Sequence, residues 1–240
     1  MPVPWLDAST DSDFPSVDRA LLDGLLAAGG DLSTSRLIKA YRHGIFPWFN
    51  ELDPILWWSP DPRLILFTDR IKISRSLKKT IQTTAITITM DQAFGDVMTA
   101  CAARRQPNTD NADSGTWIHP KMIESYTELH RQGLAHSIEC WHEGKLVGGI
   151  YGVAIGKIFF GESMFSTMRD SSKIALVSLC QQLYRWGFPL IDCQVYSAHL
   201  ASLGAEEIAR NAFINTLNQY CSIISPPNHW QLDSDLPFLS

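Results

Sequence analysis

Three consecutive apolar runs in the middle of the chain constrain its fold more than any other feature. The runs are "AHSIECWH", "KLVGGIYGVAI" and "KIFFGESMFS", and the short turns between them contain Glu143-Gly144 and Gly156. Short glycine-containing turns between strand-like runs are typical of antiparallel neighbours. The pattern therefore predicts a three-stranded antiparallel meander over residues 135–166.

Helix-like segments surround this meander on both sides. Their spacing of apolar residues predicts helices in "SRLIKAYRHG", "MDQAFGDVMTACAARR", "PKMIESYTELHRQG", "SSKIALVSLCQQLYRWG" and "EEIARNAFINTLNQY". A short buried strand, "PLIDCQV", is expected between the last two helices. Strands and helices that follow one another in this way predict an α+β fold.

Proline punctuation divides the chain near residue 62. The segment "NELDPILWWSPDPR" holds Pro54, Pro60 and Pro62, which prevent a long helix and favour a rigid, extended path. We expect a small N-terminal α/β domain over residues 1–62 and a larger domain over residues 63–240. Upstream, "GLLAAGG" is expected to be a turn that leads into the first helix.

Composition excludes several classes of protein. The chain has 240 residues and a net charge of −5, and it has no apolar run of the roughly 18 residues that span a bilayer. Its N-terminus lacks the charged start and apolar run of a signal peptide. Five widely spaced cysteines without a C-x-x-C pair, and no H-E-x-x-H, predict neither disulfides nor a metal site. We therefore expect a cytoplasmic protein.

One stretch departs from the acidic average. "RLILFTDRIKISRSLKK", residues 63–79, carries six basic residues and one acid. Such a run can attract nucleic acid, or it can be an ordinary solvated face. Rigid aromatic residues nearby, in "FPWF" and "WWSPDPR", suit stacking against an unpaired base, although core packing is the simpler explanation.

Two carboxylates fall at positions where strand alternation predicts burial. Alternation puts Glu162 on one face with Ile158, Phe160 and Met164, and puts Ser163 on the opposite face. An unpaired buried carboxylate is costly, so Glu162 must be partnered, neutral or directed at a cleft. Without G-x-S-x-G, Ser163 is not expected to be a nucleophile.

Asp192 raises the same question in "PLIDCQV". Alternation directs Asp192 and Gln194 to the same side of a short strand. A structural salt bridge would explain either acid alone. Two acids on strands of one sheet favour a functional site.

Taken together, the motifs resemble those of the leucyl/phenylalanyl-tRNA–protein transferase family. They occur in the family's order over about residues 24–215 and include "GLLAAGGDLS", "AYRHGIFPWF", "DPILWWSPDPR", "ISRSLKK", "GTWI", "HSIECW", "LVGGIYGVAIGKIFFGESMFS", "SKIAL", "LIDCQV" and "HLASLGAEEI". The resemblance implies that the larger domain has the GCN5-like N-acetyltransferase (GNAT) fold. It also implies a reaction in which Leu or Phe, and Met less well, moves from aminoacyl-tRNA to the α-amine of a protein beginning with Arg or Lys. The product is an N-end rule degradation signal.

The resemblance also implies roles for individual residues. No metal or other cofactor is implied, and a monomer is the default expectation. The expected catalytic residues are Asp192, Gln194 and Glu162. Trp48 and Trp117, with Tyr41 and Tyr126 close by, are expected to hold the terminal adenosine. An apolar pocket for the amino-acid side chain is expected from Ile150, Met164, Leu179 and Ile191. The expected contacts to tRNA phosphates are Arg75, Lys78 and Lys79.

Two other functions are considered. An acyl-CoA-dependent N-acetyltransferase would hold pyrophosphate on a glycine-rich turn before the helix after the meander, but "STMRDSSKIA" has no glycine there. A non-catalytic tRNA-binding protein would explain the basic stretch and the aromatic residues. It would not explain two acids directed at one cleft.

Overall fold

A computed structural model describes residues 3–8, 13–103, 118–223 and 230–236. Its strands are β1 (Trp5–Leu6), β2 (Leu25–Gly29), β3 (Phe46–Pro47), β4 (Leu56–Trp58), β5 (Arg63–Phe67), β6 (Thr87–Met90), β7 (Ala135–His142), β8 (Lys145–Ile155), β9 (Ile158–Ser166), β10 (Leu190–Gln194) and β11 (Glu206–Ile208). Its helices are a 3-10 turn (Val17–Arg19), α1 (Thr34–Arg42), α2 (Arg75–Thr83), α3 (Phe94–Ala103), α4 (Pro120–Arg131), α5 (Ser171–Arg185), α6 (Ala198–Ser202) and α7 (Arg210–Tyr220).

A seven-stranded sheet in the order β11-β5-β10-β9-β8-β7-β6 organises most of the chain. Strands β7, β8 and β9 form the expected antiparallel meander, and β6 extends it at one edge. On the other side, β10 pairs parallel to β9 and antiparallel to β5. The parallel pair requires a crossover, which α5 provides.

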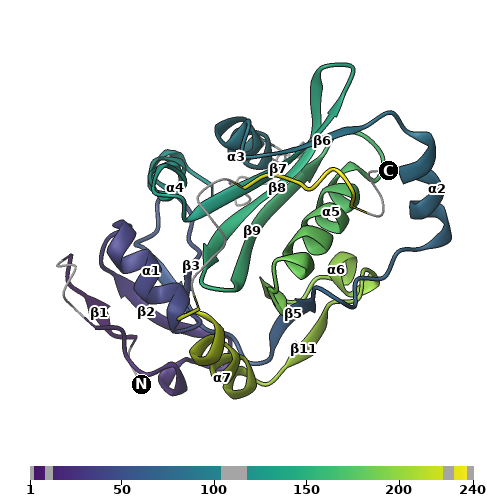
Figure 1. The fold of residues 1–240 in the computed structure, drawn as a ribbon. Coiled ribbons are helices and arrows are strands. Elements are labelled where there is room, and N and C mark those ends of the chain that lie inside the picture. The colour runs from purple at the N-terminus through teal and green to yellow at the C-terminus, as the bar shows by residue number, and fades with distance from the viewer. Residues whose placement is uncertain (1–2, 9–12, 104–117, 224–229, 237–240) are drawn as a thin grey trace.

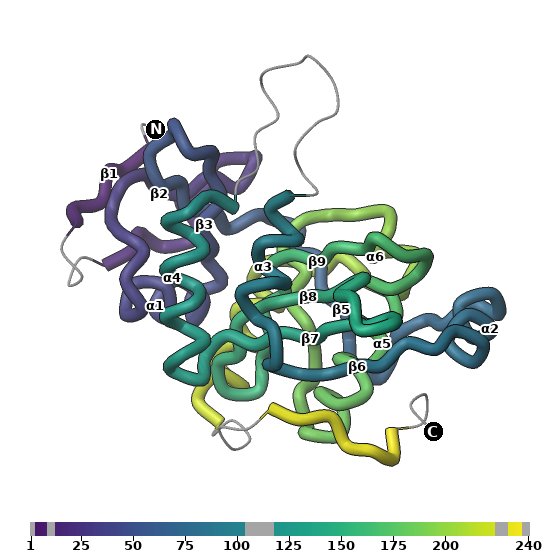
Figure 2. Tube along the Cα trace, turned by 90° about the horizontal axis from the view of Figure 1, so that it is seen from above, coloured from purple at the N-terminus to yellow at the C-terminus, as the bar shows by residue number. Residues whose placement is uncertain are grey.

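Helices cover both faces of this sheet (Figures 1 and 2). Strand alternation sends Ile158 and Phe160 into a core shared with α3, and sends Phe159 into a core shared with α5. The helix α5 is long and almost wholly buried, which explains why its sequence is apolar on more than one side.

A smaller sheet, in the order β1-β2-β4-β3, forms beside α1 near the N-terminus. Helix α1 begins at its cap Ser33, whose hydroxyl accepts a hydrogen bond from the Arg36 amide, as its sequence predicts. The fully buried ring of Trp57 anchors this region, donating from Nε1 to the Gly29 carbonyl at 2.9 Å. The structure is therefore α+β throughout.

Some expected elements are wrong. The segment "GLLAAGG" contains strand β2 rather than a turn, because its apolar residues pair with β4. The last helix begins at Arg210, and Glu206–Ile208 instead pairs with β5 as an edge strand. Both errors come from tertiary pairing that overrides local propensity. Among the described helices, none is long and apolar enough to cross a membrane.

Candidate functional site

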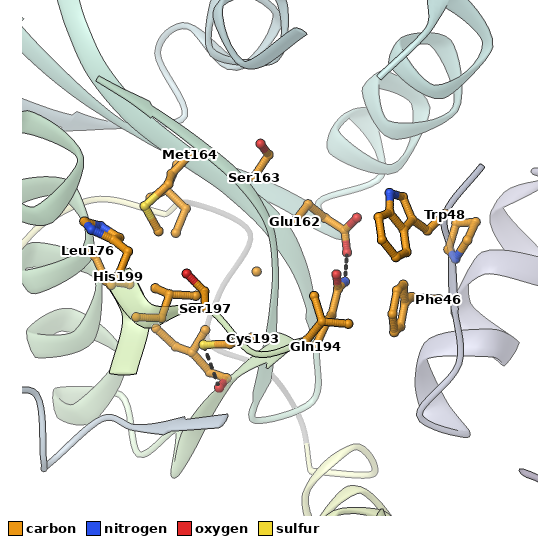
Figure 3. Close-up of a pocket in the computed structure, with 16 residues that line it drawn as sticks. Phe46, Trp48, Glu162, Ser163, Met164, Leu176, Cys193, Gln194, Ser197 and His199 are labelled. Carbon is orange, nitrogen blue, oxygen red and sulfur yellow. Dashed lines mark hydrogen bonds between the residues drawn. The ribbon is translucent and has the colours of Figure 1, made fainter. Parts of the chain in front are cut away.

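A cavity of about 240 Å³ opens where strands β9 and β10 stop pairing (Figure 3). The parallel ladder ends at the pair Asp192 and Phe160, and the next residues of both strands line the cavity. Most of its remaining wall is apolar and comes from the segment after α1 and from β8, α5 and α6. These apolar lining residues include Phe46, Trp48, Ile150, Met164, Leu176, Ile191, Val195 and Leu200.

Glu162 lies at the end of the cavity next to Trp48 and Gln194 (Figure 3). Its carboxylate accepts three hydrogen bonds, from Tyr41 at 2.7 Å, from Tyr126 at 3.1 Å and from the Gln194 amide at 2.8 Å. The two tyrosine hydroxyls also lie within hydrogen-bonding distance of each other, but each has a single hydrogen, which goes to the Glu162 carboxylate while that group is ionised. Donors from three separate elements therefore fix the side chain. Only 7% of Glu162 is exposed.

The pKa of Glu162 is raised to about 7. Burial is the main cause and the negative charge of Asp192 adds to it, while the hydrogen bonds from the three donors lower the pKa in part. Burial also raises the pKa values of Tyr41 and Tyr126 well above 10, so both hydroxyls stay protonated and keep donating. A carboxylate with a pKa near neutrality can accept a proton and release it again at physiological pH. Glu162 has the properties of a general base.

A β-bulge directs Glu162 at this position. Gly161 pairs with Gly152 and Ser163 with Tyr151, so Glu162 is an extra residue on β9. The bulge also corrects the expected alternation. Met164 packs with the α5 core, on the face opposite to Ile158 and Phe160. A single extra residue thus reverses every assignment beyond Glu162, and Ser163 is not on the face that alternation predicts.

Asp192 does not line the cavity. It is fully buried and accepts two hydrogen bonds from the Arg63 guanidinium, at 2.8 Å and 2.6 Å. Arg63 also donates to the Gly44 carbonyl at 3.1 Å and lies 4.8 Å from the ring centres of both Phe46 and Phe213. The salt bridge therefore links strand β10 to the segment that carries Gly44 and Phe46.

Gln194 connects this salt bridge to Glu162. Its backbone amide donates to Asp192 at 2.9 Å, and its side-chain amide donates to Glu162. Its φ of 65° lies in the left-handed region, which is strained for a residue other than glycine and is common at functional sites. Cys193 bulges out of the pairing with β5 just before it. The Asp192 carboxylate thus stabilises the turn that presents Gln194 to the cavity.

Comparison with known proteins identifies the family of the chain. A family model described as leucyl/phenylalanyl-tRNA protein transferase matches residues 65–218, and the model of its N-terminal domain matches residues 30–61. A leucyl/phenylalanyl-tRNA–protein transferase of Nitrosomonas europaea is 56% identical over 95% of each chain. The chain belongs to the leucyl/phenylalanyl-tRNA–protein transferase family. A member from Hydrogenovibrio crunogenus is 53% identical over 98% of this chain and 92% of its own.

Solved structures are more distant. A GCN5-related N-acetyltransferase from Kribbella flavida gives a TM-score of 0.34 at 14% identity, over 70% of this chain and 58% of its own. A conserved protein of unknown function from Staphylococcus epidermidis gives 0.41 at 9% identity, over 77% and 68%. Scores this low carry no structural argument.

The residues that the family resemblance singled out fall into distinct places. Ile150, Met164 and Ile191 line the cavity as expected, but Leu179 does not, because it is fully buried in the α5 core. Leu176, one turn earlier on α5, lines the cavity instead. Helical spacing makes these two positions hard to tell apart from sequence.

The residues expected to hold the terminal adenosine lie in different places. Trp48 lines the cavity with 41% of its surface exposed, and its carbonyl accepts from the Trp58 indole at 2.6 Å. Tyr41 and Tyr126 are fully buried behind Glu162, where they hold its carboxylate. Trp117 lies outside the described residues.

The basic stretch is smaller than its sequence indicates. Arg63 is buried in the salt bridge, and Arg70 lies between Asp69 and Glu206 and over the Phe67 ring. The other basic residues of the stretch are exposed, namely Arg70, with 61% of its side chain exposed, Lys72 before α2, and Arg75, Lys78 and Lys79 on α2. No pattern in the sequence predicts that Arg63 is buried in a salt bridge. The five cysteines, all within the described residues, form no disulfide.

Proposed function

We propose that the chain transfers a leucyl or phenylalanyl group, and methionyl less well, from aminoacyl-tRNA to the α-amine of proteins that begin with Arg or Lys. Family membership supports an aminoacyltransferase, and the product would be an N-end rule degradation signal. The observation that most strongly supports placing the transfer reaction in this cavity is that the apolar cavity ends at a carboxylate, Glu162, with a pKa of about 7.

The reaction needs little chemical activation. The donor is an ester, and an α-amine with a pKa of about 8 is neutral in about a tenth of molecules at pH 7. We propose that the amine nitrogen attacks the ester carbonyl carbon, that Glu162 takes its proton, and that Glu162 returns this proton to the tRNA ribose oxygen as the C–O ester bond breaks. The side-chain amide of Gln194 donates to Glu162, so its carbonyl oxygen remains to accept from the amine. Asp192 would act through Gln194 as a positioning residue.

The apolar lining of the cavity suits an apolar donor side chain. We propose that an unbranched or γ-branched side chain binds between Ile150, Met164 and Ile191, and that a β-branched one is disfavoured there. We propose that the terminal adenosine stacks on Trp48 and Trp117. The exposed cations Arg75, Lys78 and Lys79 on α2 would hold tRNA phosphates, with affinity that falls as salt rises.

We also propose that residues 1–62 and 63–240 are two domains and that the second has the GNAT fold. The small sheet uses strands from residues 5–58 and the large sheet uses strands from residues 63–208. The meander, the helix α5 and the parallel strand β10 that diverges from β9 support the GNAT assignment.

Coenzyme A is a poor alternative donor for this site. The N-terminus of α5, where pyrophosphate would bind, carries the carboxylate of Asp170, which is bonded to Lys173 at 2.8 Å and to Thr80 at 3.3 Å. These contacts occupy the Lys173 ammonium, and the turn before α5 has no glycine that would let pyrophosphate approach the backbone. A non-catalytic tRNA-binding protein would not require a partly protonated acid in an apolar cavity.

Transfer of labelled Leu from charged tRNA to two peptides tests the proposed function. A peptide that begins with Arg should be modified, and the same peptide beginning with Ala should not. Acetyl-CoA with the same peptides should give no product. Acetylation of the peptide, or equal labelling of both peptides, would contradict the proposal.

A further inference from the structure

We propose that Asp91, His130 and His136 form a binding site for a divalent transition-metal ion such as Zn²⁺. Among the described residues, these three offer ligand atoms that all lie within 4.8 Å of one another. They come from the turn after β6, the end of α4 and the start of β7. None of them lines the transfer cavity, so the proposal goes beyond aminoacyl transfer and does not depend on it.

Hydrogen bonds to backbone carbonyls orient both imidazole rings. His130 Nδ1 lies 2.8 Å from the Ala135 carbonyl, and His136 Nε2 lies 3.1 Å from the Gly133 carbonyl. Each of these nitrogens can donate a hydrogen to its carbonyl in the tautomer that leaves the other ring nitrogen unprotonated. In a neutral ring the other nitrogen then has a free lone pair. Metal-bound histidines typically donate their second N–H to a carbonyl or carboxylate in this way.

His136 and Asp91 bring two potential ligand atoms close together. His136 Nδ1 is 2.7 Å from Asp91 Oδ2, and with no ion bound the ring can donate an Nδ1–H to the carboxylate. An ion that replaces this hydrogen would take both atoms as ligands. Ligand atoms about 2.1 Å from a tetrahedral Zn²⁺ lie roughly 3.4 Å apart, so the two side chains would separate by less than about 1 Å on binding. Two imidazoles and one carboxylate suit Zn²⁺, Co²⁺, Ni²⁺ or Cu²⁺.

Packing holds the donor atoms in place. The ring of Phe94 stacks on His130 at 4.3 Å, and the ring of Trp230 stacks on His136 at 3.7 Å. Asp91 has a left-handed φ of 56°, and its Oδ1 accepts from a backbone amide at 2.8 Å, which leaves Oδ2 for the ion. A cavity of about 620 Å³ lined by the three donor residues gives access and room for water ligands. The bound ion would link β6, α4 and β7.

Metal binding to tag-free, chelator-treated protein tests the site. Calorimetry with Zn²⁺ should give one saturable ion per chain, and the melting temperature should rise by about 5 to 10 °C at a hundredfold excess over Kd. His130→Gln should weaken binding at least about tenfold. His43→Gln removes an exposed histidine that caps α1, and it should bind as the wild type does.

The alternative is a His136 ring that donates from Nδ1 to Asp91 with no ion bound. If wild-type protein shows no saturable binding of Zn²⁺, Co²⁺ or Ni²⁺, or if His130→Gln binds with unchanged affinity, the proposal is wrong. X-ray absorption of the Zn²⁺-loaded wild type avoids any dependence on the folding of the variant. Two imidazole ligands and an oxygen shell would support the site, and fewer than two imidazoles would overturn it.

Discussion

Removing the carboxylate of Asp192 should mainly lower the free energy of unfolding of the whole molecule. Its effect on the transfer reaction should be secondary. Arg63 is 1% exposed and Asp192 is fully buried, so Asp192→Ala leaves a guanidinium without its counter-charge in the core. Breaking a buried pair in this way costs about 3–5 kcal/mol. For a chain of this size, that cost lowers the melting temperature by roughly 6 to 20 °C.

A double-mutant cycle separates the charge effect from lost packing. Thermal and urea unfolding are measured for Asp192→Leu, for Arg63→Met and for the double variant, which leaves no unpaired charge. The double variant should be much more stable than the sum of the single costs predicts, with a coupling of about 2 kcal/mol or more. If the losses in unfolding free energy of the two single variants add up to that of the double variant, or if each is below about 1 kcal/mol, the buried salt bridge does not stabilise the fold as argued.

Transfer by Asp192→Asn completes this test. Asparagine keeps one oxygen to accept from the Gln194 amide, so the folded variant at low temperature should retain measurable transfer. A variant that is fully stable but has no transfer would mean that Asp192 takes part in the chemistry directly.

Three other predictions concern tRNA binding by α2, the Ser163 hydroxyl on β9, and the cavity proposed to hold the donor side chain. Changing Lys78 and Lys79 to Ala should weaken aminoacyl-tRNA binding and reduce its salt slope by roughly one log unit per lost contact, whereas Lys121→Ala should not; an unchanged slope would mean a merely solvated face. Ser163→Ala should keep substantial transfer, because the buried Ser163 hydroxyl has no hydrogen-bond partner within the described residues, and complete loss would restore the nucleophile hypothesis. Leu176→Phe should narrow the cavity and reduce transfer of Phe about tenfold more than transfer of Leu, and equal losses would place the side chain elsewhere.

Much of the larger sheet could be predicted from sequence. The meander, α5 and β10 each have a local signal, namely strand-like runs, helical spacing and a short apolar run between them. Strands β2 and β11 could not be predicted, because their pairing partners are distant in sequence. Alternation identified Glu162 as a buried acid, but it could not show the bulge that places this residue at the cavity.

The partners of the site residues were harder to predict than the residues themselves. Asp192 was expected to face the reacting amine, but its partner Arg63 is 129 positions away and looked like part of a basic surface. Tyr41 and Tyr126 resembled substrate contacts, yet they hold Glu162 from two different helices. The metal-site candidate has no spacing motif, since Asp91 lies 45 positions before His136. Sequence separation of this kind hides contacts that only tertiary packing creates.

The pH dependence of kcat, measured for the wild type and for Glu162→Gln, tests most directly the proposal that Glu162 takes the amine proton. With both substrates saturating, kcat reports groups in the bound complex rather than the free amine. Since the carboxylate must be ionised to take the amine proton, wild-type kcat should rise with pH as Glu162 ionises in the bound complex and then level off. Glu162→Gln should transfer at least about a hundredfold more slowly and lose this inflection. An inflection that stays at the same pH in Glu162→Gln would show that another group is the base.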